Sequence, residues 1–138
     1  MVGCGQMGSA LLSRWLDQPN FSFTVVSPSG RIVPKSVKMV RSVKALQNIR
    51  FDLIVIAVKP QMITEILPAY TDLLAEDGCY LSIAAGFSTA SIEKLAGKAS
   101  LIRIMPNLPV QIGKGVSSLY ANRYATLQQR LLIEALMA

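Results

Sequence analysis

The stretch Asp52–Val58 constrains the fold more than any other part of the chain. Its sequence, DLIVIAV, is apolar at every position after the first and is rich in β-branched residues. A strand with one face in water alternates apolar and polar residues, whereas an unbroken apolar run is typical of a strand buried on both faces. The stretch therefore predicts an interior strand of a parallel sheet that has helices on both sides.

The rest of the chain alternates between strand-like and helical patterns. Further strands are expected at Phe21–Val26, Val37–Val40, Cys79–Ala84, Leu101–Met105 and Gly115–Tyr120. Helices are expected from Gly8, near Val43–Ile49, at Gln61–Leu74 with Glu76–Gly78 as its stop, at Ser88–Gly97 and at Thr126–Met137. This alternation predicts an α/β fold with a doubly wound, mostly parallel sheet, in which Asp52–Val58 and Cys79–Ala84 are adjacent interior strands.

Composition suits one globular domain and argues against several classes of site. The chain has 138 residues, of which 51% are hydrophobic and 16% are charged, so it can bury a core of its own. It has no histidine, and its cysteines are Cys4 and Cys79, so we expect neither a histidine-based catalytic triad nor a metal site or a disulfide framework. No apolar run reaches about 18 residues and no signal peptide is recognised, so we expect a cytoplasmic protein without membrane contact.

The positive charge of the chain is concentrated in one segment. The net charge is +6, and the segment between Asp17 and Asp52 has no acidic residue but six basic ones, Arg31, Lys35, Lys38, Arg41, Lys44 and Arg50. An anionic partner and a solvated basic surface both explain such a segment, and charge alone does not decide between them. Binding to nucleic acid is not expected, because no interleaved aromatic residues or known motif accompany these cations.

The first residues contain a glycine pattern typical of dinucleotide binding. The G-x-G-x-x-G run consists of Gly3, Cys4, Gly5, Gln6, Met7 and Gly8. In a dinucleotide-binding βαβ unit the first glycine makes a tight turn, the second lets the backbone approach a pyrophosphate, and the third lets the helix pack on the strand. A glycine-rich loop without a ligand is the alternative. Only two residues precede the run, so we expect its strand to be truncated.

The end of the predicted Phe21–Val26 strand indicates which cofactor such a site would prefer. A carboxylate about 20 residues after the glycine run usually binds the ribose of NAD, but this chain has Ser27-Pro28-Ser29-Gly30-Arg31 there. A carboxylate would repel a 2′-phosphate, whereas hydroxyls and the Arg31 guanidinium accept it. The sequence therefore predicts NADP(H), with NAD(H) as a weaker alternative.

Three further motifs follow predicted strands directly. They are Ala57–Gln61 (AVKPQ), Ser82–Gly86 (SIAAG) and Arg103–Pro109 (RIMPNLP). Each has an ordinary structural explanation, since Lys-Pro starts helices, Ala-Ala-Gly packs closely and Pro-Asn-x-Pro makes turns. Because the carboxyl ends of parallel strands lie along one edge of a sheet, all three motifs and the glycine run are expected to meet at one crevice.

The glycine run, AVKPQ, SIAAG and RIMPNLP together resemble the Δ1-pyrroline-5-carboxylate reductases. The resemblance covers essentially all 138 residues. It implies a Rossmann-type fold and a part in the NADPH-dependent reduction of a small substrate, Δ1-pyrroline-5-carboxylate, to L-proline. It also implies that residues 1–138 are an NADP(H)-binding domain truncated at both ends, without the family's C-terminal helical domain. That domain forms the dimer and much of the substrate pocket, so the longer protein is expected to be a homo-oligomer.

The resemblance also implies positions for the cofactor. The glycine run would hold the pyrophosphate, and Ser27 and Pro28 would lie at the adenosine phosphate. The cofactor cleft and the nicotinamide side would be formed by Val58, Lys59, Ala85, Met105, Pro106 and Asn107. No catalytic residue is assigned to this chain, because the proton donor is expected in the part that is missing.

Two other functions stay open at this point. Another nicotinamide-dependent reductase with a similar N-terminal domain, such as a β-hydroxyacid dehydrogenase, would share the glycine run. A non-catalytic nucleotide-binding remnant would share the fold and lack the substrate domain. Substrate assays on a longer chain would separate these possibilities.

Overall fold

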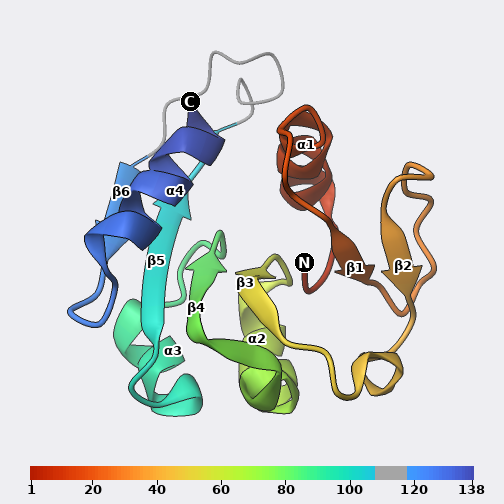
Figure 1. Ribbon diagram of the computed structural model, residues 1–138. Helices are drawn as coiled ribbons and strands as arrows, with labels where there is room; N and C mark the ends of the chain where they lie inside the picture. Colours follow the sequence, from red (N-terminus) through yellow and green to blue (C-terminus); the bar gives the residue numbers. More distant parts are fainter. Residues whose placement is uncertain (108–117) are drawn as a thin grey trace.

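The computed structural model describes residues 1–107 and 118–138. The chain folds into a β-sheet that lies between two layers of helices (Figure 1). Leu108 and Pro109 of the RIMPNLP motif, and the first three residues of the predicted Gly115–Tyr120 strand, lie outside the described residues. The elements in chain order are α1 (Gln6–Trp15), β1 (Thr24–Val26), β2 (Lys38–Val40), η1 (Val43–Leu46), β3 (Phe51–Ile56), α2 (Pro60–Ile66), η2 (Leu67–Leu73), β4 (Leu74–Ser82), α3 (Thr89–Ala96), β5 (Ser100–Met105), β6 (Ser118–Ala121) and α4 (Leu127–Met137).

The strands have the doubly wound order that the sequence predicts. β1 pairs with β2, and β3, β4 and β5 are successive neighbours, all in parallel pairs, while β6 is antiparallel to β5. Val2 forms parallel bridges to Val26 of β1 and Ile56 of β3, so it occupies the place between the two groups of strands. The order is therefore β2-β1-Val2-β3-β4-β5-β6, and the chain changes its winding direction between Val2 and β3, where open α/β sheets bind ligands.

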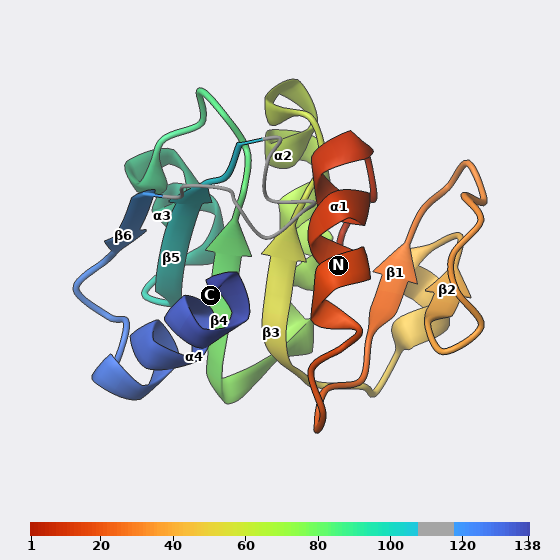
Figure 2. The same cartoon turned by 90° about the horizontal axis from the view of Figure 1, so that it is seen from above.

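Helices cover both faces of the sheet, as predicted for a buried β3. Figure 2 shows α1 and α4 on one face and α2 and α3 on the other. The first layer buries Leu11 and Trp15 of α1 and Ile133 of α4, and the second buries Ile63 of α2 and Ile92 of α3. Residues 54–56 of β3 are buried in succession, with side chains in both layers. The prediction that Asp52–Val58 and Cys79–Ala84 are adjacent interior strands is confirmed.

Two helices begin at the residues that the sequence indicates. Ser88 caps α3, since its Oγ accepts a hydrogen bond from the Ser91 backbone N–H at 3.1 Å. Thr126 caps α4 in a reciprocal capping box with Gln129. Hydroxyl caps of this kind satisfy N–H groups that have no partner within the helix.

Several predicted element boundaries are wrong. The helix predicted near Val43–Ile49 is the short 3₁₀ segment η1, which ends at Leu46. The helix predicted at Gln61–Leu74 ends at Ile66 and continues as the 3₁₀ segment η2, because Pro68 has no N–H to extend an α-helix. Glu76–Gly78 lies inside β4 rather than in a helix stop. There the register jumps from Phe51↔Leu74 to Leu53↔Cys79, so the polar residues lie in an irregular part of the ladder. The strand predicted from Phe21 begins only at Thr24.

Candidate nucleotide-binding site

The turn between Val2 and α1 requires glycine at position 3. Gly3 has φ +78°, and a Cβ atom there would lie 2.7 Å from Val58 Cγ1 and 2.9 Å from the Ala57 carbonyl oxygen. A side chain would therefore meet both an unfavourable backbone conformation and the backbone of the segment after β3. Gly3 thus makes the tight turn that leads from the sheet into the helix.

The other two glycines of the run face opposite environments. Gly5 is the N-cap of α1, and a Cβ atom there would meet nothing within 4 Å. A Cβ atom on Gly8 would lie 3.3 Å from both Ala57 Cβ and Met1 Sδ, which is a tight contact. Gly5 therefore leaves the backbone open to a ligand, while Gly8 lets α1 approach the sheet, which are the roles these positions have in a dinucleotide loop.

The amino end of α1 is electropositive. No side chain caps this helix, and its first turn has no acidic residue, so its N–H groups are available for an anion and the helix dipole adds positive charge. The Arg31 guanidinium lies nearby, with Nη2 3.4 Å from Ser9 Oγ in the first turn. The loop and helix together can therefore bind a pyrophosphate through backbone N–H groups and one cation.

The side chains between the glycines differ in what they can contact. Cys4 is buried against Leu12, Val25 and Val37, and burial raises the pKa of its thiol, with the Arg31 charge acting in the opposite direction. Gln6 is exposed and Met7 is half-buried. Cys4 is thus a packing residue whose backbone, rather than its thiol, belongs to the loop.

A tight turn follows β1 where the adenosine end of a cofactor is expected. The Gly30 N–H donates to the Ser27 carbonyl at 3.1 Å and the Ser27 N–H donates to the Val40 carbonyl at 3.0 Å, so the turn also contacts the end of β2. The hydroxyls of Ser27 and Ser29 are 3.1 Å apart, with Ser27 buried. Pro28 lies exposed at the tip of this turn.

The structure places a second cation, Arg41, at this turn, and this residue is not among the site residues predicted from the sequence. A Cβ atom on Gly30 would lie 2.6 Å from Nη2 of Arg41, so the Arg41 guanidinium lies against the backbone of the Ser27–Gly30 turn. Arg41 directly follows β2. Its position after a predicted strand is the signal that could have identified it, since ligands bind at the carboxyl ends of parallel strands.

The nicotinamide-side residues predicted from the sequence follow β3, β4 and β5 at the same edge of the sheet (Figure 2). Val58 contacts the glycine turn at Gly3, and Lys59 is the exposed N-cap residue of α2. Ala85 and Asn107 are exposed after β4 and β5, respectively. The parallel sheet therefore places these residues and the glycine loop on one edge.

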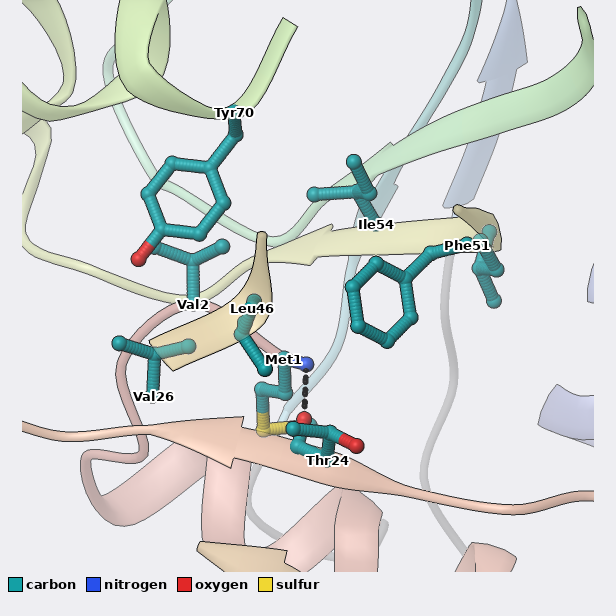
Figure 3. A pocket seen from close by; sticks show the side chains of 9 residues that line it. Met1, Val2, Thr24, Val26, Leu46, Phe51, Ile54 and Tyr70 are labelled. Carbon is teal, nitrogen blue, oxygen red and sulfur yellow. Dashed lines mark hydrogen bonds between the residues drawn. The ribbon is translucent and has the colours of Figure 1, made fainter. Parts of the chain in front are cut away.

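The apolar cavity next to Val2 is too small to compete with this edge as a nucleotide site. It has a volume of about 20 Å³, room for about one water molecule. Figure 3 shows Val26, Leu46 and Tyr70 among the side chains around it. The Met1 amino group beside it donates to the Thr24 carbonyl at 2.6 Å, and burial lowers its pKa to about 6.

The described residues have neither a metal-binding cluster nor a membrane-spanning helix. Residues 1–107 and 118–138 contain no cluster of three or more histidine, cysteine, aspartate or glutamate residues that could hold a metal ion. Within the same residues, none of the helices has the length and apolar character needed to cross a membrane.

Comparison with known proteins agrees with the geometry of the glycine loop. Residues 1–86 match the family described as "NADP oxidoreductase coenzyme F420-dependent". The chain belongs to this family. The match includes the glycine loop, the turn after β1 and the motifs after β3 and β4.

Curated relatives confirm the resemblance stated from the motifs. A pyrroline-5-carboxylate reductase of Aquifex aeolicus is 32% identical over 143 residues, which cover 99% of this chain and 52% of the relative. The corresponding protein of Haemophilus influenzae is 36% identical over 90 residues, covering 61% of this chain and 33% of the relative. The chain thus spans about half the length of the curated relative that it matches along nearly all its residues.

Solved structures confirm the Rossmann-type fold. A Plasmodium falciparum pyrroline carboxylate reductase with NADP bound has a TM-score of 0.83 at 23% identity, over 99% of this chain and 51% of its own. A pyrroline-5-carboxylate reductase of Coxiella burnetii has a TM-score of 0.81 at 25% identity, over 99% and 53%. A prephenate dehydrogenase of A. aeolicus shares the fold at a TM-score of 0.74 and 15% identity.

Proposed function

We propose that this chain is the NADP(H)-binding part of a pyrroline-5-carboxylate reductase. The observation that carries the proposal is the glycine loop, in which position 3 makes a turn, position 5 is open and position 8 packs closely. These contacts fit a bound pyrophosphate. The substrate part of the proposal rests on the curated relatives, because proteins with other substrates share the fold.

In this function the chain binds and orients the cofactor. The N–H groups at the start of α1 would hold the pyrophosphate, and the turn at Ser27 would take the adenosine end. The residues Val58, Lys59, Ala85 and Asn107 would face the nicotinamide side. The bound cofactor supplies the hydride that reduces the imine, and the protein contributes positioning and electrostatics.

The remaining features of the proposal concern the longer protein. Substrate contacts and a proton donor would come from a further domain. The domain described above would form the cofactor-binding half of the longer protein. We also propose that the longer protein is a homo-oligomer and acts in the cytoplasm. The relatives are about twice the length of this chain, which leaves room for such a domain.

Calorimetric titration of the chain with NADPH and NADH tests the cofactor assignment. We expect NADPH to bind more tightly, since no acidic residue lies between Asp17 and Asp52 to repel a 2′-phosphate. Equal affinity for the two cofactors would refute the preference, and failure of both to bind would refute the nucleotide-binding function.

Assays of pyrroline-5-carboxylate reduction with NADPH test whether this chain binds the cofactor while catalysis requires a further domain. The 138-residue chain should bind the cofactor and turn over little substrate, whereas a chain extended to the length of the relatives should be active. Robust turnover by the short chain would show that the catalytic groups are already present in it. An extended chain that binds NADPH but reduces only another substrate would favour a different reductase.

A further inference from the structure

The adenosine end of the candidate site has two arginines that point to different places. Arg31 follows the Ser27–Gly30 turn in sequence, but its guanidinium extends to α1, where Nη2 lies 3.4 Å from Ser9 Oγ. Arg41 is distant in sequence from the turn, yet its guanidinium lies against Gly30. The two cations therefore flank the turn from opposite sides, one next to the glycine loop and one beyond β1.

The parallel pairing of β1 and β2 explains the position of Arg41. Val26 pairs with Val40 at the carboxyl ends of the two strands, and the Ser27 N–H donates to the Val40 carbonyl at 3.0 Å. The residues that follow the two strands, Ser27 after β1 and Arg41 after β2, therefore lie next to each other at the carboxyl ends. β1 separates β2 from Val2 in the sheet, so Arg41 lies about two strand spacings, roughly 10 Å, from the strand that leads into the glycine loop.

Gly30 makes room for the guanidinium. Its φ of +68° favours glycine, and a Cβ atom would lie 2.6 Å from Arg41 Nη2 and 2.9 Å from Cζ. Within residues 1–107 and 118–138, Arg41 forms no ion pair. The exposed Arg41 guanidinium thus lies against Gly30, in the turn that carries the Ser27 and Ser29 hydroxyls, without a carboxylate to neutralise it.

We propose that Arg41, rather than Arg31, is the residue that selects the 2′-phosphate of the cofactor. This inference rests on the proposed NADP(H)-binding function. The planar guanidinium donates hydrogen bonds to a phosphate in a fork geometry, and the Ser27–Ser29 hydroxyl pair, in which one O–H donates to the other, has one O–H left to add. Arg31, next to the first turn of α1, acts instead on the pyrophosphate, which NADPH and NADH have in common.

The test measures the ratio of NADPH to NADH affinity in three glutamine variants of the chain by calorimetry at one salt concentration. Arg41→Gln should weaken NADPH binding by about 10- to 100-fold and change NADH binding by about twofold or less. Arg31→Gln should weaken both cofactors by similar factors. Arg50→Gln is the matched control, because Arg50 is exposed and precedes β3 at the opposite edge of the sheet, and it should change neither.

Smaller probes and a second variant make the test sharper. 2′,5′-ADP and ADP differ in the position of one phosphate, so Arg41→Gln should weaken the first and spare the second. Arg41→Lys keeps the charge without the fork and should give an intermediate NADPH to NADH ratio. Circular dichroism and thermal melting check that each variant is folded, and Arg41 is exposed, so its replacement should leave both unchanged.

The outcomes separate this inference from the function on which it rests. Loss of selectivity in Arg31→Gln but not in Arg41→Gln would overturn the inference and leave NADPH binding established. Equal weakening of NADPH and NADH by Arg41→Gln would overturn it as well. If the unaltered chain binds neither cofactor, the proposed function fails and the inference fails with it.

Discussion

The glycine loop allows the cost of a side chain to folding to be separated from its cost to binding. Gly3→Ala and Gly5→Ala add the same methyl group two residues apart. At position 3 the methyl group meets φ +78° and the Ala57 carbonyl oxygen at 2.9 Å, whereas at position 5 it meets nothing within 4 Å. The first change should therefore act on the fold and the second on the ligand.

The expected stability changes follow from these contacts. For Gly3→Ala, the left-handed conformation costs about 1–2 kcal/mol and forced repacking about 1–3 kcal/mol, less about 0.4–1 kcal/mol gained from a stiffer unfolded chain. The free energy of unfolding should fall by about 1–5 kcal/mol. For Gly5→Ala, φ −72° and ψ −163° suit alanine. The weaker N-cap preference of alanine offsets its effect on the unfolded chain, so the change should stay within about 0.5 kcal/mol.

For NADPH binding we expect the opposite order, with Gly5→Ala having the direct effect on the ligand. An alanine at position 5 keeps the pyrophosphate from the N–H groups of α1, and loss of a hydrogen bond to a charged group, about 1.5–3 kcal/mol, weakens NADPH by about 10- to 100-fold. Urea unfolding and calorimetric titration of the two variants measure both quantities. If Gly5→Ala binds NADPH as the unaltered chain does, Gly5 does not face the cofactor. If Gly3→Ala is as stable as the unaltered chain, the turn does not have the described conformation.

Three further predictions concern stability and association. Asn122→Ala should lower the free energy of unfolding in urea by about 3 kcal/mol or more, since the buried Oδ1 accepts backbone N–H bonds of 3.0, 3.2 and 3.1 Å; Glu93→Gln, which changes only a partner of the Asn122 Nδ2 and leaves these three bonds in place, should lower it less if they matter. Burial, with a smaller effect of Asp72, raises the pKa of Tyr80 to about 12, so stability present below about pH 10 should be lost as the pH rises towards 12. Between these pH values, the free energy of unfolding of Tyr80→Phe should therefore fall by about 2–3 kcal/mol less than that of the unaltered chain. Equal falls in the two proteins would refute the raised pKa of Tyr80. The exposed Leu127, Leu131 and Leu132 of α4 should promote self-association of the chain, so Leu131→Lys should lower its molar mass in sedimentation more than the control Gln128→Lys does.

Features that depend on local sequence were predictable. The apolar run Asp52–Val58 became β3 because only an interior strand buries both faces, and the hydroxyls of Ser88 and Thr126 cap the helices expected after them. The boundaries that failed depend on tertiary pairing. Glu76–Gly78 has turn-forming residues, yet the irregular register opposite β3 keeps it within β4.

The same distinction explains which half of the candidate site could be predicted. The glycine loop is local: Gly3, Gly5 and Gly8 belong to one turn and one helix, so their spacing was enough to assign each a role. The adenosine end is not local, because the cation next to the turn comes from another strand. A basic segment shows that cations are present, but only the β1–β2 register shows that Arg41 lies at Gly30 while Arg31 extends to α1. Cofactor preference in this chain should therefore depend on a residue after β2, and a substitution there can change the preference without altering the glycine loop.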